Sequence, residues 1–206
     1  KFRLDHSEAK FVIVSRNNLD KINSIKGELG NLEKVILLDP KPSYDKDEIF
    51  IEDVKKLGED FLSSRYDEFL TRINSIGPDD NANICYTSGT TADPKGIILT
   101  HRNYTANIEQ TLTLMDVPSW WSTLLILPWD HSFAHTVGIY IMMATGASLA
   151  AVQSGKSYLD SLKHISENIK EIKPVFLFSA PALAKGLRKG IEKAIRDKGA
   201  FTEKPS

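Results

Sequence analysis

The sequence predicts an α/β fold with a mostly parallel sheet flanked by helices. Runs of β-branched and aromatic residues with the length of strands alternate along the chain with segments whose apolar residues recur at helical spacing. The sequence contains no internal repeat and no low-complexity tract. A length of 206 residues, of which 41% are hydrophobic, is enough to bury a core. Alternation of this kind packs as parallel strands between layers of helices.

The first expected elements form a βαβ unit. Residues 11–15 and 35–38 are apolar and rich in β-branched residues, which predicts two strands. Between them we expect a helix that Asp20 caps and Gly30 ends. Parallel strands joined in this way have a right-handed crossover. Residues 41–81 are a polar segment, and within it two stretches have apolar residues at helical spacing.

The rest of the chain continues the alternation. Residues 83–86 and 96–100 are predicted strands on the two sides of a loop. The elements expected after them are a helix over 100–115, a strand over 123–127, a helix over 133–145, a strand over 148–152, a helix that Ser157 and Asp160 cap, a strand over 174–178 and a helix that Pro181 opens. The last two helices carry apolar stripes that we expect to face inward, namely Leu162, Ile165, Ile169 and Ile172 in the first and Leu183, Leu187, Ile191 and Ile195 in the second.

The run from Tyr86 to Gly96 is the most informative segment. It combines small residues, hydroxyls and one lysine in a single loop between two strands. The backbone N–H groups and hydroxyls of such a loop can donate to phosphate oxygens, and Lys95 adds a positive charge. A Walker A loop instead needs a hydroxyl directly after its lysine and a helix after that. Pro94 precedes the lysine here and Gly96 follows it, which leaves a different phosphate loop or a solvated surface turn.

The same run resembles the signature of the adenylate-forming superfamily, roughly S/T-S/T-G-S/T-T-x-x-P-K-G. Every specified position from Thr87 to Gly96 is met. Ala92 stands where the family often has glycine, so the loop has less backbone freedom at that position.

Other segments carry further resemblance to that superfamily. Residues 127–133 are similar to its motif of a strand ending in L-P-x-x-H, and residues 173–181 are similar to its later strand that begins K-P-T. Residues 6–14 resemble a strand that commonly reads S-E-A-K. Together with residues 70–80, these segments look most like the long-chain fatty acyl-CoA synthetase branch.

The resemblance implies a fragment of the large N-terminal domain of an adenylate-forming enzyme. The family has a Y-G-x-T-E segment, a ribose-binding aspartate and a catalytic lysine in a small C-terminal domain, and none of these is found here. We therefore expect residues 1–206 to be a single incomplete α/β domain. An N-terminal part, the later nucleotide-binding segments and the small domain would be missing, and the fragment alone should be inactive.

The resemblance also implies the chemistry of carboxylate activation. A carboxylic acid attacks the α-phosphate of ATP, pyrophosphate leaves, and a thiol such as that of coenzyme A opens the acyl-adenylate. Mg²⁺ is the implied metal, with no ligand assigned in this chain. The implied phosphate-binding residues are Thr87, Ser88, Gly89, Thr90, Thr91, Pro94, Lys95 and Gly96.

By the same resemblance, His131 lies near the substrate carboxylate. Its neighbours Trp129 and Phe133 are candidates for lining the acyl pocket. The alternatives are a helix-capping or core histidine and aromatic residues of an ordinary core. A metal site of His131 and His135 is disfavoured, since no third ligand or adjacent glutamate follows the H-E-x-x-H pattern. The remaining histidines are expected to be surface or packing residues: His6, His101 and His164.

Two other functions stay open beside an acyl-CoA ligase. One is an adenylating enzyme that loads a carrier-protein thiol or activates an amino acid. The other is a degenerate adenylation fold that serves as a non-catalytic interaction module. The length of the acyl chain is also open, because the residues after Phe133 differ from those usual in the long-chain branch.

Charge and cysteine content exclude several classes of protein. The 26 basic and 27 acidic residues give a net charge of −1, which provides no basic excess for binding nucleic acid. The longest apolar run, residues 138–152, is shorter than the ~18 residues of a membrane-spanning helix. The single cysteine, Cys85, suits a reducing compartment. We expect a cytoplasmic or membrane-peripheral protein, with self-association of the fragment through apolar surface that a longer chain would cover.

Overall fold

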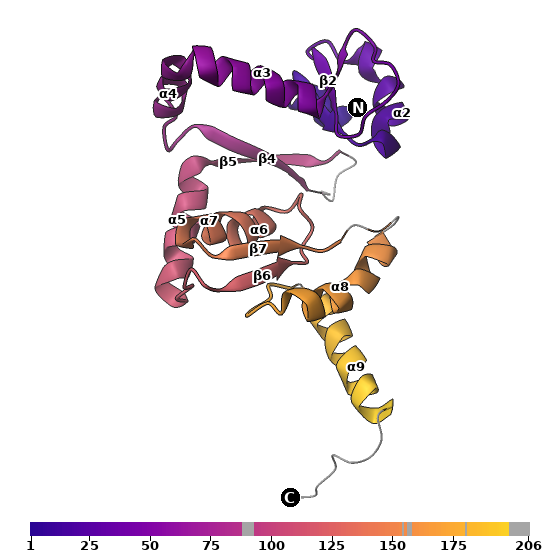
Figure 1. Ribbon diagram of the computed structural model, residues 1–206, viewed down its shortest axis with the longest axis vertical. Helices are drawn as coiled ribbons and strands as arrows, with labels where there is room; N and C mark the ends of the chain where they lie inside the picture. The colour runs from indigo at the N-terminus through magenta and orange to yellow at the C-terminus, as the bar shows by residue number, and fades with distance from the viewer. Residues whose placement is uncertain (88–92, 154, 156–157, 180, 198–206) are drawn as a thin grey trace, which may run out of the picture. The chain divides into compact units, whose positions relative to one another are not determined.

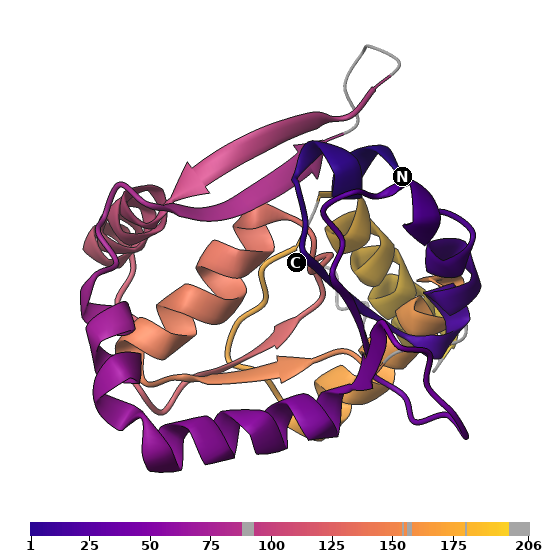
Figure 2. The same cartoon turned by 90° about the horizontal axis from the view of Figure 1, so that it is seen from above.

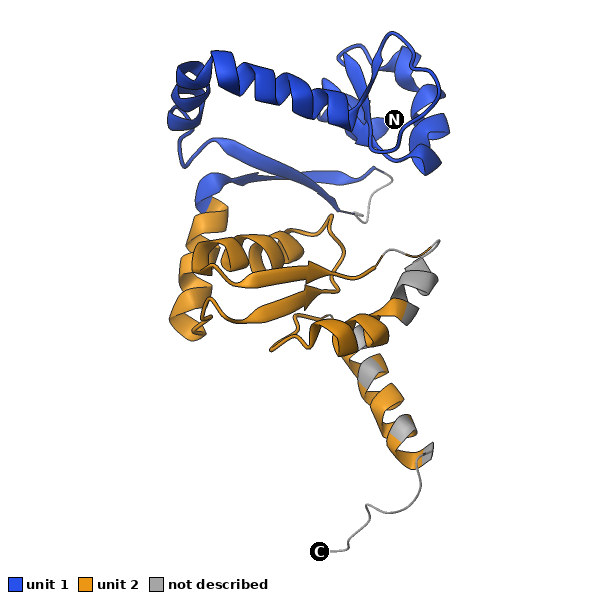
Figure 3. Ribbon diagram, viewed as in Figure 1, with its two compact units in different colours: residues 1–102 blue, residues 103–206 orange. Residues whose placement is uncertain are grey.

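The computed structural model describes residues 1–87, 93–153, 155, 158–179 and 181–197. Helices and strands alternate through most of this chain (Figure 1). They fall into two compact units, residues 1–102 and residues 103–206 (Figure 3). Each unit has strands and a buried core cluster of its own, which confirms the α/β class.

The first unit contains a three-stranded parallel sheet in the order β1-β2-β3. The elements that build it are β1 (Phe11–Val14), α2 (Arg16–Asn23), the short helix η1 (Lys26–Glu28), β2 (Lys34–Leu37) and β3 (Glu48–Phe50). The predicted βαβ unit is therefore confirmed. Its core is formed by Val14, Val35 and Leu37, with Leu19 and Ile22 of α2 packed against them.

The start of α2 differs from the prediction. Ser15 is the N-cap residue, so Asp20 lies inside the helix and does not cap it. The Arg16 N–H donates to the Asp39 carboxylate at 2.7 Å. Because a residue distant in the sequence satisfies this first N–H group, the local sequence could not reveal where the helix begins.

Strand β3 was not predicted, whereas the two helices after it were. β3 has three residues and begins with the charged Glu48, so it lacks the alternating pattern by which strands are recognised. Pairing with β2 determines its conformation, with Val35 opposite Glu48. The expected helical patterns correspond to α3 (Ile51–Ser64) and α4 (Tyr66–Asn74).

The first unit also contains an antiparallel hairpin and a short N-terminal helix. The hairpin consists of β4 (Asn81–Thr87) and β5 (Lys95–Thr100), and the helix is α1 (Phe2–His6). Both hairpin strands were predicted. A register irregularity lies near the start of β4, between Asn81 and Asn83.

The second unit contains a parallel pair of strands joined by a helical crossover. The strands are β6 (Ser122–Leu125) and β7 (Ser148–Ala151), and the crossover runs through α6 (Ser132–Ala134), the π-helical stretch η2 (His135–Tyr140) and α7 (Ile141–Thr145). This crossover helix lies along one face of the strand pair in both views (Figure 1 and Figure 2). The remaining helices are α5 (His101–Leu114), α8 (Tyr158–Ile172) and α9 (Pro181–Asp197).

Gly138 allows the crossover helix to approach β6 closely. A Cβ atom added at this position would lie 2.7 Å from Cδ1 of Leu125, a buried residue of β6. The core around this contact contains Val137, Ile141 and Met142, each at most 3% exposed. The predicted substrate-pocket residues thus lie at, or just before, the start of a tightly packed helix.

Two predictions for the second unit were confirmed only in part. The expected strand over 174–178 is reduced to one bridge, between Phe176 and Thr123. Of the predicted buried stripes, Ile165 is 3% exposed, but Ile172, Ile191 and Ile195 are 38%, 62% and 53% exposed. An apolar stripe marks the face of a helix that can be buried, and it does not guarantee that a partner is present. The side chains of Leu162, Leu183 and Leu187 and the residue Ser157 lie outside the described part.

Candidate functional site

Those predicted phosphate-binding residues that the structure describes lie at one end of the β4–β5 hairpin. Thr87, the last residue of β4, pairs directly with Lys95, the first residue of β5. The two side chains are exposed, and directly opposed residues of an antiparallel pair have Cβ atoms about 4.5–5.5 Å apart. One hydroxyl and one ammonium group are therefore carried by the last residue pair of the hairpin. Ser88, Gly89, Thr90 and Thr91 lie outside the described residues.

Lys95 forms no ion pair or hydrogen bond with any side chain that the structure describes. A lysine locked into an internal ion pair could not serve an incoming anion. Its position at the exposed end of the hairpin, beside half-buried Pro94, is compatible with the predicted role.

The loop end of this hairpin is held by α1. Tyr86 Oη lies 2.8 Å from His6 Nδ1, and the Arg3 guanidinium lies 5.9 Å from the centre of the Tyr86 ring. The ring of Phe2 stacks on that of His6. The sequence had indicated only a surface or packing role for His6. Its contact with Tyr86 joins residues 80 positions apart, so no local pattern could have predicted it.

Gly96 is required by packing as well as by the loop motif. A Cβ atom at this position would lie 3.1 Å from Ile84 Cγ2 and 3.2 Å from Tyr86 Cε1. These are tighter than ordinary van der Waals contacts, so even an alanine would displace a neighbour. The small residue allows the Tyr86 ring to lie across the start of β5 and reach His6.

A second group of predicted residues lies at the start of the crossover helix. His131 is the N-cap residue, and its Nδ1 accepts a hydrogen bond from the Phe133 N–H at 3.1 Å. The helix-capping alternative is therefore what the structure contains. Because Nδ1 accepts, the neutral ring carries its proton on Nε2. Capping thus leaves an exposed N–H donor on the other side of the imidazole.

The aromatic neighbours of His131 are not ordinary core residues. The side chain of Trp129 is 49% exposed and that of Phe133 is 45% exposed. The Phe133 ring meets Phe178 edge-to-face at 5.9 Å. Both rings offer apolar surface that the second unit leaves uncovered.

His135 has a hydrogen-bond partner at each ring nitrogen. Nε2 is 2.7 Å from the Trp129 carbonyl oxygen, and Nδ1 is 3.1 Å from the Tyr104 hydroxyl. Both ring nitrogens are therefore engaged in contacts within the protein. Among the described residues, no group of three His, Cys, Asp or Glu side chains could hold a metal ion, so we assign no Mg²⁺ ligand in this part of the chain.

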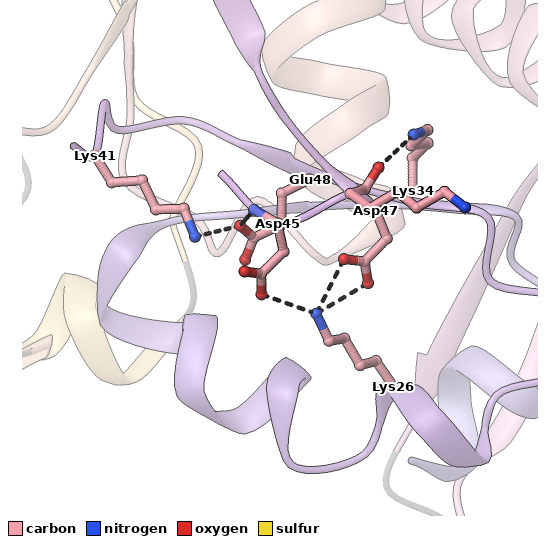
Figure 4. Close-up of polar contacts among 7 residues, drawn as sticks. Lys26, Lys34, Lys41, Asp45, Asp47 and Glu48 are labelled. Carbon is pink, nitrogen blue, oxygen red and sulfur yellow. Dashed lines mark hydrogen bonds and ion pairs between the residues drawn. The ribbon is translucent and has the colours of Figure 1, made fainter. Parts of the chain in front are cut away.

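A charged cluster around β3 was not predicted (Figure 4). Lys26 contacts Asp45 and Asp47, and Lys41 forms an ion pair with Glu48, whose side chain is fully buried. Burial alone would raise the pKa of Glu48, but the Lys41 ammonium and the Asp45 N–H bring it below its ordinary value. The pKa of Asp47 is lowered chiefly by its hydrogen bond from Lys26. These charges stabilise the fold around β3, and none belongs to the predicted site.

Within the described residues, no helix is long and apolar enough to span a bilayer.

A family model described as "AMP-binding enzyme" matches residues 1–203. The chloroplastic long-chain-fatty-acid–acyl-carrier-protein ligase AEE15 of Arabidopsis thaliana is 30% identical over 134 residues, which are 65% of this chain and 17% of that protein. The peroxisomal long chain acyl-CoA synthetase 6 of Arabidopsis thaliana is 26% identical over 208 residues, covering 99% of this chain and 28% of that protein. The chain thus spans less than a third of the length of these relatives.

Solved structures share the fold. The anthranilate CoA ligase AuaEII superposes with a TM-score of 0.69 at 20% identity, over 88% of this chain and 33% of that chain. A long-chain-fatty-acid-CoA ligase, FadD1, from Archaeoglobus fulgidus superposes with a TM-score of 0.64 at 21% identity, over 93% of this chain and 35% of that one. Since the family model covers nearly every residue, the chain belongs to the AMP-binding enzyme family of adenylate-forming proteins.

Proposed function

We propose that this chain carries the ATP phosphate-binding hairpin of an acid–thiol ligase that activates a fatty acid as its acyl-adenylate and transfers it to coenzyme A. The observation that carries the proposal is the register of the β4–β5 hairpin, which pairs Thr87 with Lys95 at its exposed end. Membership of the AMP-binding family supports the use of ATP. The names of relatives as long-chain acyl-CoA synthetases support a fatty acid and coenzyme A.

The residues of the loop would act by positioning and by electrostatic stabilisation. As the carboxylate attacks the α-phosphate, negative charge builds on the departing pyrophosphate. The Lys95 ammonium and the Thr87 hydroxyl would lie against its oxygens, where preorganised donors stabilise a transition state more than a ground state. The full set proposed for this role is Thr87, Ser88, Gly89, Thr90, Thr91, Pro94, Lys95 and Gly96.

We assign His131 to the carboxylate of the acid substrate. The cap fixes its tautomer, so Nε2–H is a donor that can bind one carboxylate oxygen and leave the other free to attack. The exposed apolar surfaces of Trp129 and Phe133 would contact the first part of the acyl chain.

Transfer to a carrier-protein thiol is the second candidate function. It is favoured by the 30% identity to a relative named as an acyl-carrier-protein ligase. The two candidates share the adenylation step and differ only in the thiol acceptor. Product formation with coenzyme A and with a phosphopantetheinylated carrier protein, measured side by side, separates them.

The proposal is tested by ATP–pyrophosphate exchange in the complete protein that contains this chain. We expect exchange that requires a fatty acid, and acyl-thioester formation when coenzyme A is added. A protein that binds its partners but exchanges no pyrophosphate with any fatty, aromatic or amino acid would be the non-catalytic module. That result would overturn the proposal.

A further inference from the structure

Three groups form a hydrogen-bonded chain behind the turn that carries Trp129 and His131: the Tyr104 hydroxyl, the His135 ring and the Trp129 carbonyl. The distances are 3.1 Å from Tyr104 Oη to His135 Nδ1 and 2.7 Å from His135 Nε2 to the carbonyl oxygen. We call these two hydrogen bonds and the three groups that they join the brace. A carbonyl oxygen can only accept, so His135 Nε2 must carry a proton. In the neutral ring, Nδ1 then accepts from the Tyr104 hydroxyl.

The brace is anchored in the core of the second unit. Tyr104 lies on α5 and is 6% exposed. Its ring meets that of Tyr140 edge-to-face at 4.8 Å, which fixes the direction of its hydroxyl. His135 is half-buried and follows directly after the first residues of the crossover helix. Through these contacts, the exposed turn that carries Trp129 and His131 is connected to the buried ring of Tyr104.

The Trp129 carbonyl controls the orientation of the whole turn. The His131 N–H donates to the Pro128 carbonyl at 3.1 Å, so residues 128–131 form a tight turn in which the Trp129 peptide is central. Rotation of that peptide would change ψ of Trp129 and φ of Asp130, and it would thereby shift the turn that presents Trp129 and the next residue, His131. Without His135, the Trp129 carbonyl would lose the donor that holds it on the protein side.

We propose that Tyr104 and His135 are positioning residues for the acid substrate, acting through the Trp129 peptide on the imidazole of His131 and the indole of Trp129. The inference rests on the proposed function of those two side chains. Neither Tyr104 nor His135 is proposed to touch the reacting atoms. Their effect should fall on the use of the acid and not on the binding of ATP, because the phosphate-binding residues belong to the separate β4–β5 hairpin.

The test compares three variants in the complete protein by fatty-acid-dependent ATP–pyrophosphate exchange. His135→Ala removes the brace, His135→Gln keeps an N–H donor at nearly the same reach, and Tyr104→Phe removes one hydroxyl while the ring remains. His101→Ala and Tyr66→Phe are the matched controls, since both residues are exposed and lie outside the brace.

We expect His135→Ala to lower kcat/KM for the acid by about tenfold to a hundredfold, the range that a misplacement of about 1 Å can produce. KM for ATP should stay within a factor of about two, and His135→Gln should recover most of the loss. Tyr104→Phe should cost about threefold to tenfold, the equivalent of one hydrogen bond. Loss of kcat with both KM values unchanged and no recovery in His135→Gln would indicate a merely structural role and overturn the inference.

A second readout uses the chain itself and needs no activity. ¹⁵N NMR of ring-labelled histidine should show the proton of neutral His135 on Nε2, and the same tautomer for His131. His135 with its proton on Nδ1 would contradict the brace. A wild-type protein without any exchange activity would refute the proposed function but leave this tautomer result standing, so the two failures can be told apart.

Discussion

The units of residues 1–102 and 103–206 are stabilised by different interactions. In the first unit, a small apolar cluster of Val14, Val35 and Leu37 is supplemented by the charged cluster around β3. In the second unit, the residues around His131 rest on a tightly packed helix and on hydrogen bonds between neutral groups. The first unit should therefore respond to pH and to charge removal, and the second to changes of side-chain volume and of hydrogen bonds between uncharged groups.

The largest expected effect on stability comes from breaking the buried ion pair of the first unit. Lys41→Met keeps most of the side-chain volume but leaves the Glu48 carboxylate buried without its cation. We expect a loss of about 3 kcal/mol in the free energy of unfolding, as for other buried pairs deprived of one partner. Hydrogen exchange should accelerate for the amides of β2 and remain unchanged in β6.

Lys55→Met is the matched control, because Lys55 pairs with Glu52 at the surface. Little change is expected there, since exposed ion pairs contribute little. Equal effects of the two substitutions, or faster exchange in both units after Lys41→Met, would contradict the proposed difference between the two units.

A substitution that adds volume should affect the second unit instead. Gly138→Val places methyl groups where a single Cβ already lies 2.7 Å from Leu125 Cδ1. We expect a loss of about 1–3 kcal/mol, the usual cost of overpacking a core. Gly58→Ala is the control: nothing lies within 4 Å of the added Cβ, and this helical position should gain about 0.5–1 kcal/mol. Chemical denaturation with hydrogen exchange measures the size and location of both effects.

Acid should weaken the first unit selectively. The folded pKa values of Glu48 and Asp47 lie below their ordinary values of 4.5 and 3.8. A lowered carboxyl pKa stabilises the folded state above the ordinary pKa, and this contribution is lost as pH falls through the lowered value. The free energy of unfolding should thus hold down to about pH 5 and decline below it. Glu48→Gln should be less stable at neutral pH and show a shallower decline; an unchanged slope would contradict the assignment.

The smallest expected effect on stability separates the two roles of His131. His131→Ala removes the N-cap and should cost about 1 kcal/mol, whereas His131→Asn supplies a good capping side chain and should cost much less. Both substitutions remove the imidazole Nε2–H and should lower fatty-acid-dependent exchange to the same extent. If activity instead follows stability, so that Asn restores both, His131 is a cap and nothing more.

The sequence was sufficient to predict those parts of the fold that depend on local pattern. The βαβ unit, the hairpin strands and most helices follow from the periodicity of apolar residues within short windows of the sequence. β3 escaped prediction because its three residues begin with a charge and take their conformation from β2. The apolar run expected as a strand over 174–178 does lie beside β6, but among the residues that the structure describes its pairing is limited to the bridge between Phe176 and Thr123.

The candidate site also contains residues that the local sequence predicted and residues that it did not. Lys95, Thr87 and His131 carry the proposed chemistry, and their residue types in a recognisable order made them predictable. His6, Tyr104 and His135 support those residues through contacts that span 80, 31 and 6 positions, and no short motif records such pairs. The spacing of His131 and His135 by four residues was the one available signal, because it places both on the same side of a helix.

The role of the β4–β5 hairpin is tested by the rate of ATP–pyrophosphate exchange in the complete protein after Lys95→Ala. We expect a decrease of ~10²-fold or more, comparable with the loss of one preorganised donor to a transition state. Lys56→Ala removes another exposed charge, on α3, and should leave the rate unchanged. Exchange at the wild-type rate in the Lys95 variant would contradict the claim that this hairpin binds the phosphates of ATP.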